Sequence, residues 1–443
     1  MFQNAAVQTA SHLESLTEKI ASRTARVGIV GLGYVGLPLA VEFAKAGFSV
    51  TGIDVLESKV ARINAGDSYV QDVEVKDVSS LVEAGKLRAT TDFSVIAELD
   101  TLNICVPTPL RKTKDPDMSY IVTACQEIAK YFRPGSLVIL ESTTYPGTTE
   151  ELLLPILGDS GLQVGRDFFL CFSPERVDPG NPNYQTRNIP KVVGGLTPAC
   201  TQMGTLFYSQ ALETVISVCS TQVAEMVKLL ENTFRMINIG LVNEMAMMCT
   251  RMGIDIWEVI EAAATKPFGF MPFYPGPGLG GHCIPIDPFY LSWKSKQAGM
   301  EARFIELAGY INGQMPHFVV DKVQNALNDQ GKAVKGSKIH ILGVAYKKDI
   351  EDVRESPALD IMHLLRQRGA DVTFSDPYVP SLRIEGNIYF SADLPGSLQH
   401  ADCVVIITDH SSVDYAAVVN EGKLIVDTRN ALRGIVSQKI VRL

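Results

Sequence analysis

The architecture of this chain follows from residues 26–36, which read Arg26-Val27-Gly28-Ile29-Val30-Gly31-Leu32-Gly33-Tyr34-Val35-Gly36. The first five residues are mostly apolar and rich in β-branched side chains, and such a run predicts a buried strand. Three glycines then mark a turn, and residues 37–46 have the apolar spacing of a helix. A strand, a glycine turn and a helix in this order predict a parallel sheet wrapped by helices.

The same alternation continues in both halves of the chain. Apolar runs predict further strands at residues 49–53, 101–106, 137–140 and 168–172, and later at 338–343, 371–375, 403–408 and 424–427. Residues 357–368 predict a helix, and residues 221–264 predict a long helical middle. We therefore expect an α/β chain with two Rossmann-like, doubly wound parallel sheets joined by that middle.

The helical middle has two interpretations. A long apolar helix at the centre of a chain is often shared with a second subunit, which predicts a homodimer or a higher homo-oligomer. The alternative is a linker helix buried within one subunit. Residues 1–24 are expected to form a polar extension with helical character outside the main fold.

Composition limits the classes of function. Of the 443 residues, 46% are hydrophobic and 20% are charged, which is typical of a soluble globular protein with two or three domains. The formal net charge of −9 disfavours non-specific binding to nucleic acid. The sequence has neither a leader pattern nor a run of about 18 apolar residues, so we expect no membrane association.

The eight cysteines include no CxxC pair and no spacing typical of zinc ligands. A metal site built on His282 and Cys283 would lack a partner pair, so we expect no metal. Most of the cysteines lie in apolar runs, which favours buried, reduced thiols in a cytoplasmic protein.

The glycine loop has the spacing of a dinucleotide-binding fingerprint. Gly31 allows the tight turn, Gly33 lets the backbone approach a pyrophosphate, and Gly36 permits close packing of helix on strand. Asp54 ends the next strand, where a carboxylate accepts hydrogen bonds from a ribose diol and repels a 2′-phosphate. This pattern favours NAD over NADP. The alternative is a structural glycine turn in a domain that binds no dinucleotide.

A second glycine-rich loop, residues 276–288, contains Cys283 and, four positions later, Asp287. Small residues let the backbone approach a substrate, a thiolate can attack an aldehyde, and a carboxylate can organise water or accept a proton. Together with a dinucleotide site, this loop suggests an enzyme that oxidises an alcohol past the aldehyde to an acid and uses NAD twice. The alternative is a packed cysteine in a turn.

Two further clusters of polar residues are candidates for binding. Lys228 and Asn232 share one face of the helical middle and could converge on an oxyanion, although a solvated helix stripe has the same pattern. Lys347-Lys348-Asp349 and Arg354-Glu355-Ser356-Pro357 follow the first strand of the second α/β unit. Cations at that place suit a diphosphate, and the alternative is a surface charge cluster.

Together these motifs resemble the UDP-glucose/UDP-mannuronate dehydrogenase family of nucleotide-sugar 6-dehydrogenases. The resemblance covers residues 26–429 and rests on the following motifs: Gly-Leu-Gly-Tyr-Val-Gly at 31–36, Pro107-Thr108-Pro109, Glu141-Ser142-Thr143, Ser173-Pro174-Glu175-Arg176, Lys228-Leu229-Leu230-Glu231-Asn232, Gly280-Gly281-His282-Cys283, Tyr346-Lys347-Lys348-Asp349 and Arg354-Glu355-Ser356. It implies four segments: the extension 1–24, an NAD-binding domain 25–217, a central dimerisation domain with the cysteine loop 218–328, and a UDP-sugar-binding domain 329–443.

The resemblance also implies roles for single residues. Cys283 is expected to be the covalent nucleophile, Lys228 and Asn232 to stabilise an oxyanion, and Asp287 to assist proton transfer. Glu175 resembles a residue that assists thioester hydrolysis, and Thr143 one that orders the catalytic water. The expected NAD contacts are Gly31, Gly33, Tyr34, Val35, Gly36, Asp54, Lys59, Thr108, Thr143 and Arg354. The expected UDP-sugar contacts are Glu175, Arg176, Lys228, Asn232, Gly280 and Lys347.

The expected reaction has four steps. The sugar C6 alcohol is oxidised by NAD, Cys283 traps the aldehyde as a thiohemiacetal, a second NAD oxidises this to a thioester, and water releases the uronic acid. Glucose-oxidising relatives carry a Pro-Glu-Phe-Leu stretch and a lysine after the catalytic cysteine, where this chain has Pro174-Glu175-Arg176 and Ile286. The aromatic loop 268–278 is more similar to the corresponding loop of UDP-N-acetylglucosamine 6-dehydrogenases than to that of the mannosamine enzymes. The resemblance therefore implies that the product is a uronic acid that supplies a surface polysaccharide.

Other functions stay open at this point. UDP-N-acetylmannosamine or UDP-glucose could be the substrate of the same reaction. A two-electron dehydrogenase of small hydroxy acids would need neither Cys283 nor the second α/β unit. A non-catalytic binder of NAD or a UDP-sugar would make no NADH.

Overall fold

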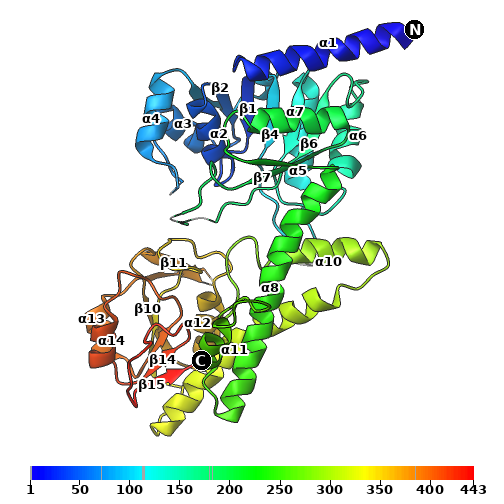
Figure 1. Ribbon diagram of the computed structural model, residues 1–443. Helices are drawn as coiled ribbons and strands as arrows, with labels where there is room; N and C mark the ends of the chain where they lie inside the picture. The colour runs from blue at the N-terminus through cyan, green and yellow to red at the C-terminus, as the bar shows by residue number, and fades with distance from the viewer. Residues whose placement is uncertain (1, 71, 112–114, 179, 182, 385) are drawn as a thin grey trace. The chain divides into compact units, whose positions relative to one another are not determined.

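The computed structural model describes residues 2–70, 72–111, 115–178, 180–181, 183–384 and 386–443. The chain divides into two compact units, residues 1–231 and 232–443. The boundary falls within the long helix α8, Thr221–Met252 (Figure 1). The division into four segments expected from the sequence stays a prediction.

The first unit is built on an eight-stranded sheet with the order β3-β2-β1-β4-β5-β6-β7-β8. Its strands are β1 Arg26–Val30, β2 Ser49–Ile53, β3 Leu87–Thr90, β4 Thr101–Ile104, β5 Leu137–Leu140, β6 Phe169–Phe172, β7 Lys191–Gly195 and β8 Val215–Val218. Neighbouring strands run parallel except β6 and β7, which pair antiparallel. The chain reverses its direction of growth between β1 and β4, and the carboxyl ends of such strands form the usual ligand crevice of a doubly wound sheet.

Helices cover both faces of this sheet (Figure 1). They are α1 Phe2–Ala21, α2 Gly36–Lys45, α3 Glu57–Asn64, α4 Val75–Glu83, α5 Ser119–Tyr131, α6 Leu154–Gly158 and α7 Pro198–Tyr208, with a 3-10 turn η1 at Phe93–Glu98 and a π-helical turn η2 at Thr149–Leu153. Two separate apolar clusters, one on each face, form the core. The second half of α1 belongs to this core, since Leu16 and Ile20 are buried in it. The sequence analysis expected residues 1–24 to lie outside the main fold. Most positions in this segment are polar, so the short apolar stripe that includes Leu16 and Ile20 was not recognised.

The second unit begins with helices. The remainder of α8 packs on α9 Ile256–Ala264 through a small apolar cluster that includes Ala246 and Trp257. Next come α10 Asp287–Gln297 and α11 Arg303–Asp329. A methyl group added to Gly240 of α8 would lie 3.1 Å from the Ala308 Cβ, so this small residue lets α8 approach α11 closely.

A five-stranded, fully parallel sheet with the order β10-β9-β13-β14-β15 completes the second unit. Its strands are β9 Lys338–Leu342, β10 Asp371–Ser375, β13 Cys403–Ile406, β14 Ile425–Asp427 and β15 Ile440–Arg442; the flanking helices are α12 Pro357–Gln367, α13 Leu394–His400 and α14 Tyr415–Glu421. A hairpin of β11 Ser381–Ile384 and β12 Asn387–Phe390 lies outside this sheet. Here the order reverses between β9 and β13, which marks the expected ligand crevice of this sheet.

The expected α/β class with two doubly wound sheets is confirmed. The antiparallel pairing of β6 with β7 is a departure from the expected parallel sheet. Among the helices within the described residues, none has the length and apolar content needed to cross a membrane.

Candidate functional site

The glycine loop has the geometry of a dinucleotide site. Gly31 adopts a φ of +91°, which favours glycine. A Cβ on Gly36 would lie 1.9 Å from the Gly31 carbonyl oxygen, so α2 can approach β1 only without a side chain there. A Cβ on Gly33 would meet nothing within 4 Å, which leaves open space at the point where the backbone would face a pyrophosphate. Tyr34 and Val35 complete the turn into α2, and α2 begins without a side-chain cap.

Asp54 lies at the carboxyl end of β2 and is buried. Its carboxylate accepts hydrogen bonds from the Leu32 N–H at 2.9 Å and the Leu56 N–H at 3.0 Å, and thereby ties the glycine loop to the neighbouring strand. The Lys59 ammonium lies 3.2 Å from the same carboxylate. The structure therefore brings together two of the predicted NAD contacts, Asp54 and Lys59, directly beside the glycine loop.

These residues fit NAD. The open space at Gly33 and the uncapped start of α2 would hold the pyrophosphate, and Asp54 would hold a ribose diol. Bound NAD supplies a hydride acceptor. Thr108 and Thr143, two further predicted contacts, follow β4 and β5 at the same edge of the sheet. The neighbouring Ser142 hydroxyl donates to the Val106 carbonyl at 2.7 Å and so joins these two loops.

Glu175, which follows β6, belongs to a buried ionic network. The Lys191 ammonium lies 3.3 Å from Glu175 and 2.6 Å from Glu141, and all three side chains are buried. The Tyr208 hydroxyl at 2.6 Å and the Asn103 amide at 2.7 Å also donate to Glu141. Both carboxylates are therefore paired with hydrogen-bond donors.

The charge state of Glu175 follows from this network. Burial alone would raise its pKa, but the nearby Lys191 charge, the N–H groups of Val177 and Arg176, and the Lys228 charge lower it below the usual value. The pKa of Lys191 is correspondingly raised: burial opposes the ammonium, and the charges of Glu141 and Glu175 outweigh burial. Glu175 is thus an anion at neutral pH, suited to hold a water molecule or a cation.

Lys228 and Arg176 surround Glu175 within the first unit. The Lys228 ammonium donates to the Glu175 carbonyl at 2.6 Å, and the Lys228 side chain is buried rather than part of a solvated stripe. The Arg176 guanidinium lies 2.5 Å from the Glu231 carboxylate and donates to the Pro190 carbonyl at 2.7 Å. The predicted residues Glu175, Arg176 and Lys228 therefore lie together.

The second unit contains the cysteine loop. Cys283 is half-buried, and its carbonyl accepts the N–H groups of Ile286 at 3.1 Å and Asp287 at 2.8 Å in the turn that starts α10. The buried Asp287 carboxylate accepts a hydrogen bond of 2.6 Å from the side-chain amide of Asn232 on α8. Three of the predicted catalytic residues, Cys283, Asp287 and Asn232, are thus held by one helix start and its contact with α8.

The cysteine loop packs on the loop after β9. The Gly281 N–H donates to the Arg354 carbonyl at 2.9 Å. A Cβ on Gly280 would lie 2.5 Å from the Tyr346 Cβ, and Gly281 has a φ of +85° with the Tyr346 ring against it. Two adjacent glycines therefore let the loop of Cys283 lie against the segment that carries Lys347. This segment follows β9, where the strand order reverses between β9 and β13 and a ligand crevice is expected.

Arg354 is engaged differently from its predicted role. Its guanidinium is exposed and forms a two-pronged ion pair with Asp352, with distances of 2.6–3.0 Å. This pair lies in the second unit, beside the cysteine loop. The predicted contact of Arg354 with NAD therefore stays a prediction.

Lys191 and Glu141 are candidate functional residues whose contacts the sequence did not predict. In the antiparallel ladder, Phe172 pairs with Gly194 and Cys171 with Gly195. Continuing this register brings the start of β7, Lys191, opposite Glu175. The sequence does show a lysine at the start of the otherwise apolar segment 191–193. Its contact with Glu175 could be predicted only if the antiparallel direction of β7 were already known.

In the described part of the chain, no group of three or more His, Cys, Asp or Glu side chains is placed so that it could hold a metal ion. The eight cysteines form no disulfide and six of them are buried.

Comparisons with known proteins agree with this geometry. Residues 25–212 match the NAD-binding domain of the UDP-glucose/GDP-mannose dehydrogenase family, residues 222–314 its central domain, and residues 340–434 its UDP-binding domain. A UDP-N-acetyl-D-glucosamine 6-dehydrogenase of Pseudomonas aeruginosa is 37% identical over 80% of this chain and 83% of its own. A UDP-N-acetyl-D-mannosamine dehydrogenase of Pyrococcus horikoshii is 34% identical over 92% and 96% of the two chains. The solved structure of a Pyrococcus horikoshii UDP-D-ManNAc dehydrogenase superposes with a TM-score of 0.87 at 33% identity, covering 94% of this chain and 98% of that one.

Proposed function

Because this chain belongs to the UDP-glucose/GDP-mannose dehydrogenase family and is an NAD-dependent UDP-sugar dehydrogenase, we propose that it oxidises the C6 alcohol of UDP-N-acetylglucosamine to the acid through Cys283. The observation that carries the proposal is the packing of Gly280 and Gly281 against Tyr346. Within the second unit, this packing brings the loop that carries Cys283 against the segment that carries Lys347. That segment lies in the region that matches the family's UDP-binding domain.

Each residue has a part in the proposed course. The alcohol loses its proton to water held by Asp287 and Lys228 as C6 is oxidised to the aldehyde. The Cys283 sulfur then bonds to C6, and the resulting oxyanion is stabilised by Asn232 and Lys228 before it takes up a proton. Oxidation of this thiohemiacetal, for which a second NAD would supply the hydride acceptor, gives a thioester.

Hydrolysis completes the course. A water molecule, ordered by Thr143 and by the anionic Glu175, attacks the thioester carbonyl and releases the carboxylate and the thiol. The low pKa of Glu175 suits a group that holds this water and stays charged throughout. Gly31, Gly33, Tyr34, Val35, Gly36, Asp54, Lys59, Thr108 and Arg354 are proposed to hold NAD, and Arg176, Gly280 and Lys347 the UDP-sugar.

UDP-N-acetylmannosamine is the second candidate substrate, since several similar enzymes are named for it. Turnover of UDP-N-acetylglucosamine, UDP-N-acetylmannosamine and UDP-glucose under identical conditions tests the choice. We expect kcat/KM for UDP-N-acetylglucosamine to exceed the other two at least about tenfold, the usual effect of one well-placed contact in a binding pocket. A higher value for either other sugar would reassign the substrate but leave the reaction in place.

We also propose that the enzyme is a homodimer, or a larger homo-oligomer, joined through the face of α8 in the second unit. This face is apolar yet exposed: Leu241 is 56% exposed, Met245 37%, Met248 47% and Met252 58%. Exposed Phe304, Leu307 and Tyr310 on α11 belong to the same unit. A set of large apolar side chains of this kind marks an interaction site. The cysteines, as thiols, suit a reducing compartment such as the cytoplasm.

A further inference from the structure

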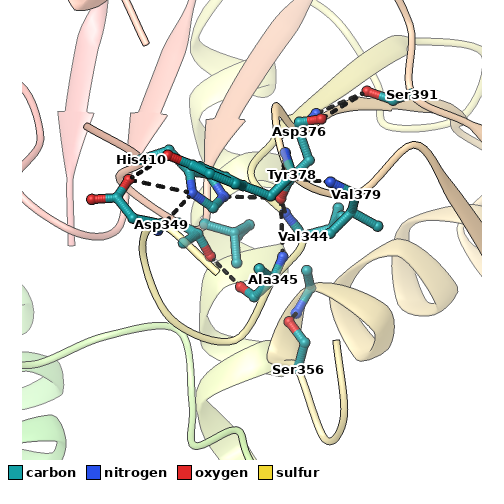
Figure 2. A network of polar contacts seen from close by, with 12 residues as sticks. Val344, Ala345, Asp349, Ser356, Asp376, Tyr378, Val379, Ser391 and His410 are labelled. Carbon is teal, nitrogen blue, oxygen red and sulfur yellow. Dashed lines mark hydrogen bonds and ion pairs between the residues drawn. The ribbon is translucent and has the colours of Figure 1, made fainter. Parts of the chain in front are cut away.

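Three loops of the second unit meet at the carboxyl ends of β9, β10 and β13 (Figure 2). Asp376 follows β10, and one oxygen of its carboxylate accepts the N–H groups of Val344 at 2.7 Å and Ala345 at 3.1 Å. His410 follows β13 and is fully buried, and its Nε2 lies 2.9 Å from the same oxygen. Its other nitrogen, Nδ1, accepts the Asp349 N–H at 3.0 Å.

These contacts settle where the proton of the His410 ring lies. A ring nitrogen that accepts a hydrogen bond carries no proton, so in the neutral ring the proton is on Nε2 and is donated to Asp376. Burial acts to raise the pKa of Asp376, but the His410 hydrogen bond and the backbone N–H donors lower it below the usual value, which keeps the acceptor charged. The ring therefore links the two loops through two hydrogen bonds: Nε2 donates to Asp376, and Nδ1 accepts from the Asp349 N–H.

Asp349 needs such support. Its φ is +62°, in the left-handed region that residues with a side chain rarely adopt. Its carboxylate accepts the Ser411 N–H at 2.7 Å and the Ser411 hydroxyl at 2.6 Å. His410 and Ser411 thus hold both the backbone and the side chain of Asp349 in this conformation.

The segment between these contacts carries the two lysines. Ala345 is fixed by Asp376 and by the Thr408 hydroxyl, which donates to the Ala345 carbonyl at 2.6 Å. Asp349 is fixed by His410. Lys347 and Lys348 therefore lie on a short span whose two ends are joined through one imidazole ring.

We propose that His410 is a positioning residue for the UDP-sugar: it holds the turn of Lys347 in the shape that binds the diphosphate, through the N–H of Asp349. This inference rests on the proposed contact of Lys347 with the UDP-sugar. A turn fixed before binding loses less conformational entropy when the ligand arrives, so the effect of His410 is an effect on UDP affinity.

Two substitutions separate the two hydrogen bonds of the ring. In His410→Asn the side-chain oxygen can replace Nδ1 as acceptor of the Asp349 N–H. In His410→Gln the amide nitrogen can replace Nε2 as donor to Asp376, but the Asp349 N–H loses its acceptor. The dissociation constants of UDP and of NAD are measured by calorimetry on the full-length enzyme, with Lys347→Met as a reference variant.

We expect His410→Gln to weaken UDP binding about tenfold, since an N–H in this position has lost its partner, and His410→Asn to weaken it less than about threefold. NAD binding should stay the same in both variants. Equal weakening by Asn and Gln, or wild-type UDP affinity in His410→Gln, would overturn the proposal. If Lys347→Met binds UDP normally, the lysine contact itself is wrong; if only Lys347→Met is weakened, the contact stands and the role of His410 fails.

Discussion

Lys191 neutralises buried negative charge in the first unit. It is the cation shared by two buried carboxylates, Glu141 and Glu175. Buried ion pairs are weak evidence for net stability, because desolvation offsets their attraction. Removing one partner is different, because the remaining charges stay buried without compensation.

We therefore predict that Lys191→Met lowers the free energy of unfolding by about 3–5 kcal/mol. The control is Lys130→Met, which removes an exposed ammonium paired with Glu127 at 2.6 Å and should cost less than about 1 kcal/mol. Chemical denaturation of both variants measures the difference. Equal costs would show that Lys191 is not a structural counter-ion.

The glycine loop allows a second pair of substitutions to separate binding from folding. Gly33→Ala adds a methyl group where nothing lies within 4 Å, so the free energy of unfolding should change by less than about 1 kcal/mol. NAD affinity should nevertheless fall at least about tenfold, because the methyl group occupies the approach of the pyrophosphate. Gly36→Ala places its methyl 1.9 Å from a backbone oxygen and should destabilise the fold by about 1–3 kcal/mol.

Thermal unfolding and NAD titration of both variants provide the test. A Gly33→Ala enzyme that binds NAD as tightly as the wild type would place the pyrophosphate elsewhere.

The places of the candidate site residues along the sheet could be predicted from the sequence better than their hydrogen-bond partners. Gly31, Asp54, Thr108, Thr143 and Glu175 could be placed at one edge of the sheet, because each follows a predicted apolar strand or its extension. The hydrogen bond between Asn232 and Asp287 could not be predicted, since it joins positions separated by 55 residues that no periodic pattern relates.

At the scale of elements, β9 contains an unusual residue. His340 is buried in this strand, its Nδ1 lies 2.9 Å from the Thr373 hydroxyl, and its Nε2 has no hydrogen-bond partner among the described residues. Burial lowers the pKa of His340 to about 4, from an ordinary value of 6.5. A charged imidazole is therefore excluded from the folded strand near neutral pH.

This shift predicts the pH dependence of stability. Between pH 6.5 and about 4 the unfolded chain binds a proton at His340 and the native chain does not, so the free energy of unfolding falls as the pH falls through this range. The loss due to this group is on the order of 3 kcal/mol when both states are protonated. In His340→Asn, whose amide does not titrate, this part of the slope should disappear.

Chemical denaturation at pH 7.0, 6.0, 5.0 and 4.5 tests the prediction. These values cover, in steps of about half a pH unit to one unit, the range in which the unfolded chain takes up the proton. His400→Asn, which replaces an exposed histidine on α13, serves as the control and should keep the wild-type slope. An unchanged slope in His340→Asn would mean that this buried ring is not responsible.

Elements with a strong apolar pattern were predicted well. Strands β1, β2, β5 and β10 begin and end where the sequence placed them, and α12 differs by one residue. The hairpin β11–β12 and strands β3, β7, β8 and β15 were not predicted. β8 has mostly exposed or half-buried residues, and the hairpin lies outside the main sheet, so a search for buried runs passes over both.

At the scale of the whole molecule, the proposed assembly makes a direct prediction. Leu241→Glu combined with Met245→Glu places two charges on the exposed apolar face of α8 and should convert the oligomer to a monomer, because buried unpaired charges strongly disfavour association. Light scattering coupled to size exclusion measures the mass. Lys130→Glu on α5 is the charge-changing control and should keep the wild-type mass. An unaltered mass in the double variant would exclude this face as the interface.

The central claim is that one enzyme carries out two successive oxidations at C6, with Cys283 holding the intermediate between them. The most direct measurement is the amount of NADH formed from a limiting amount of UDP-N-acetylglucosamine, with the product identified by mass. The account predicts two NADH for each sugar and a carboxylate product. It also predicts that Cys283→Ala forms the acid far more slowly than the wild type. One NADH for each sugar with a free aldehyde as product, or a Cys283→Ala enzyme that still makes the acid normally, would contradict it.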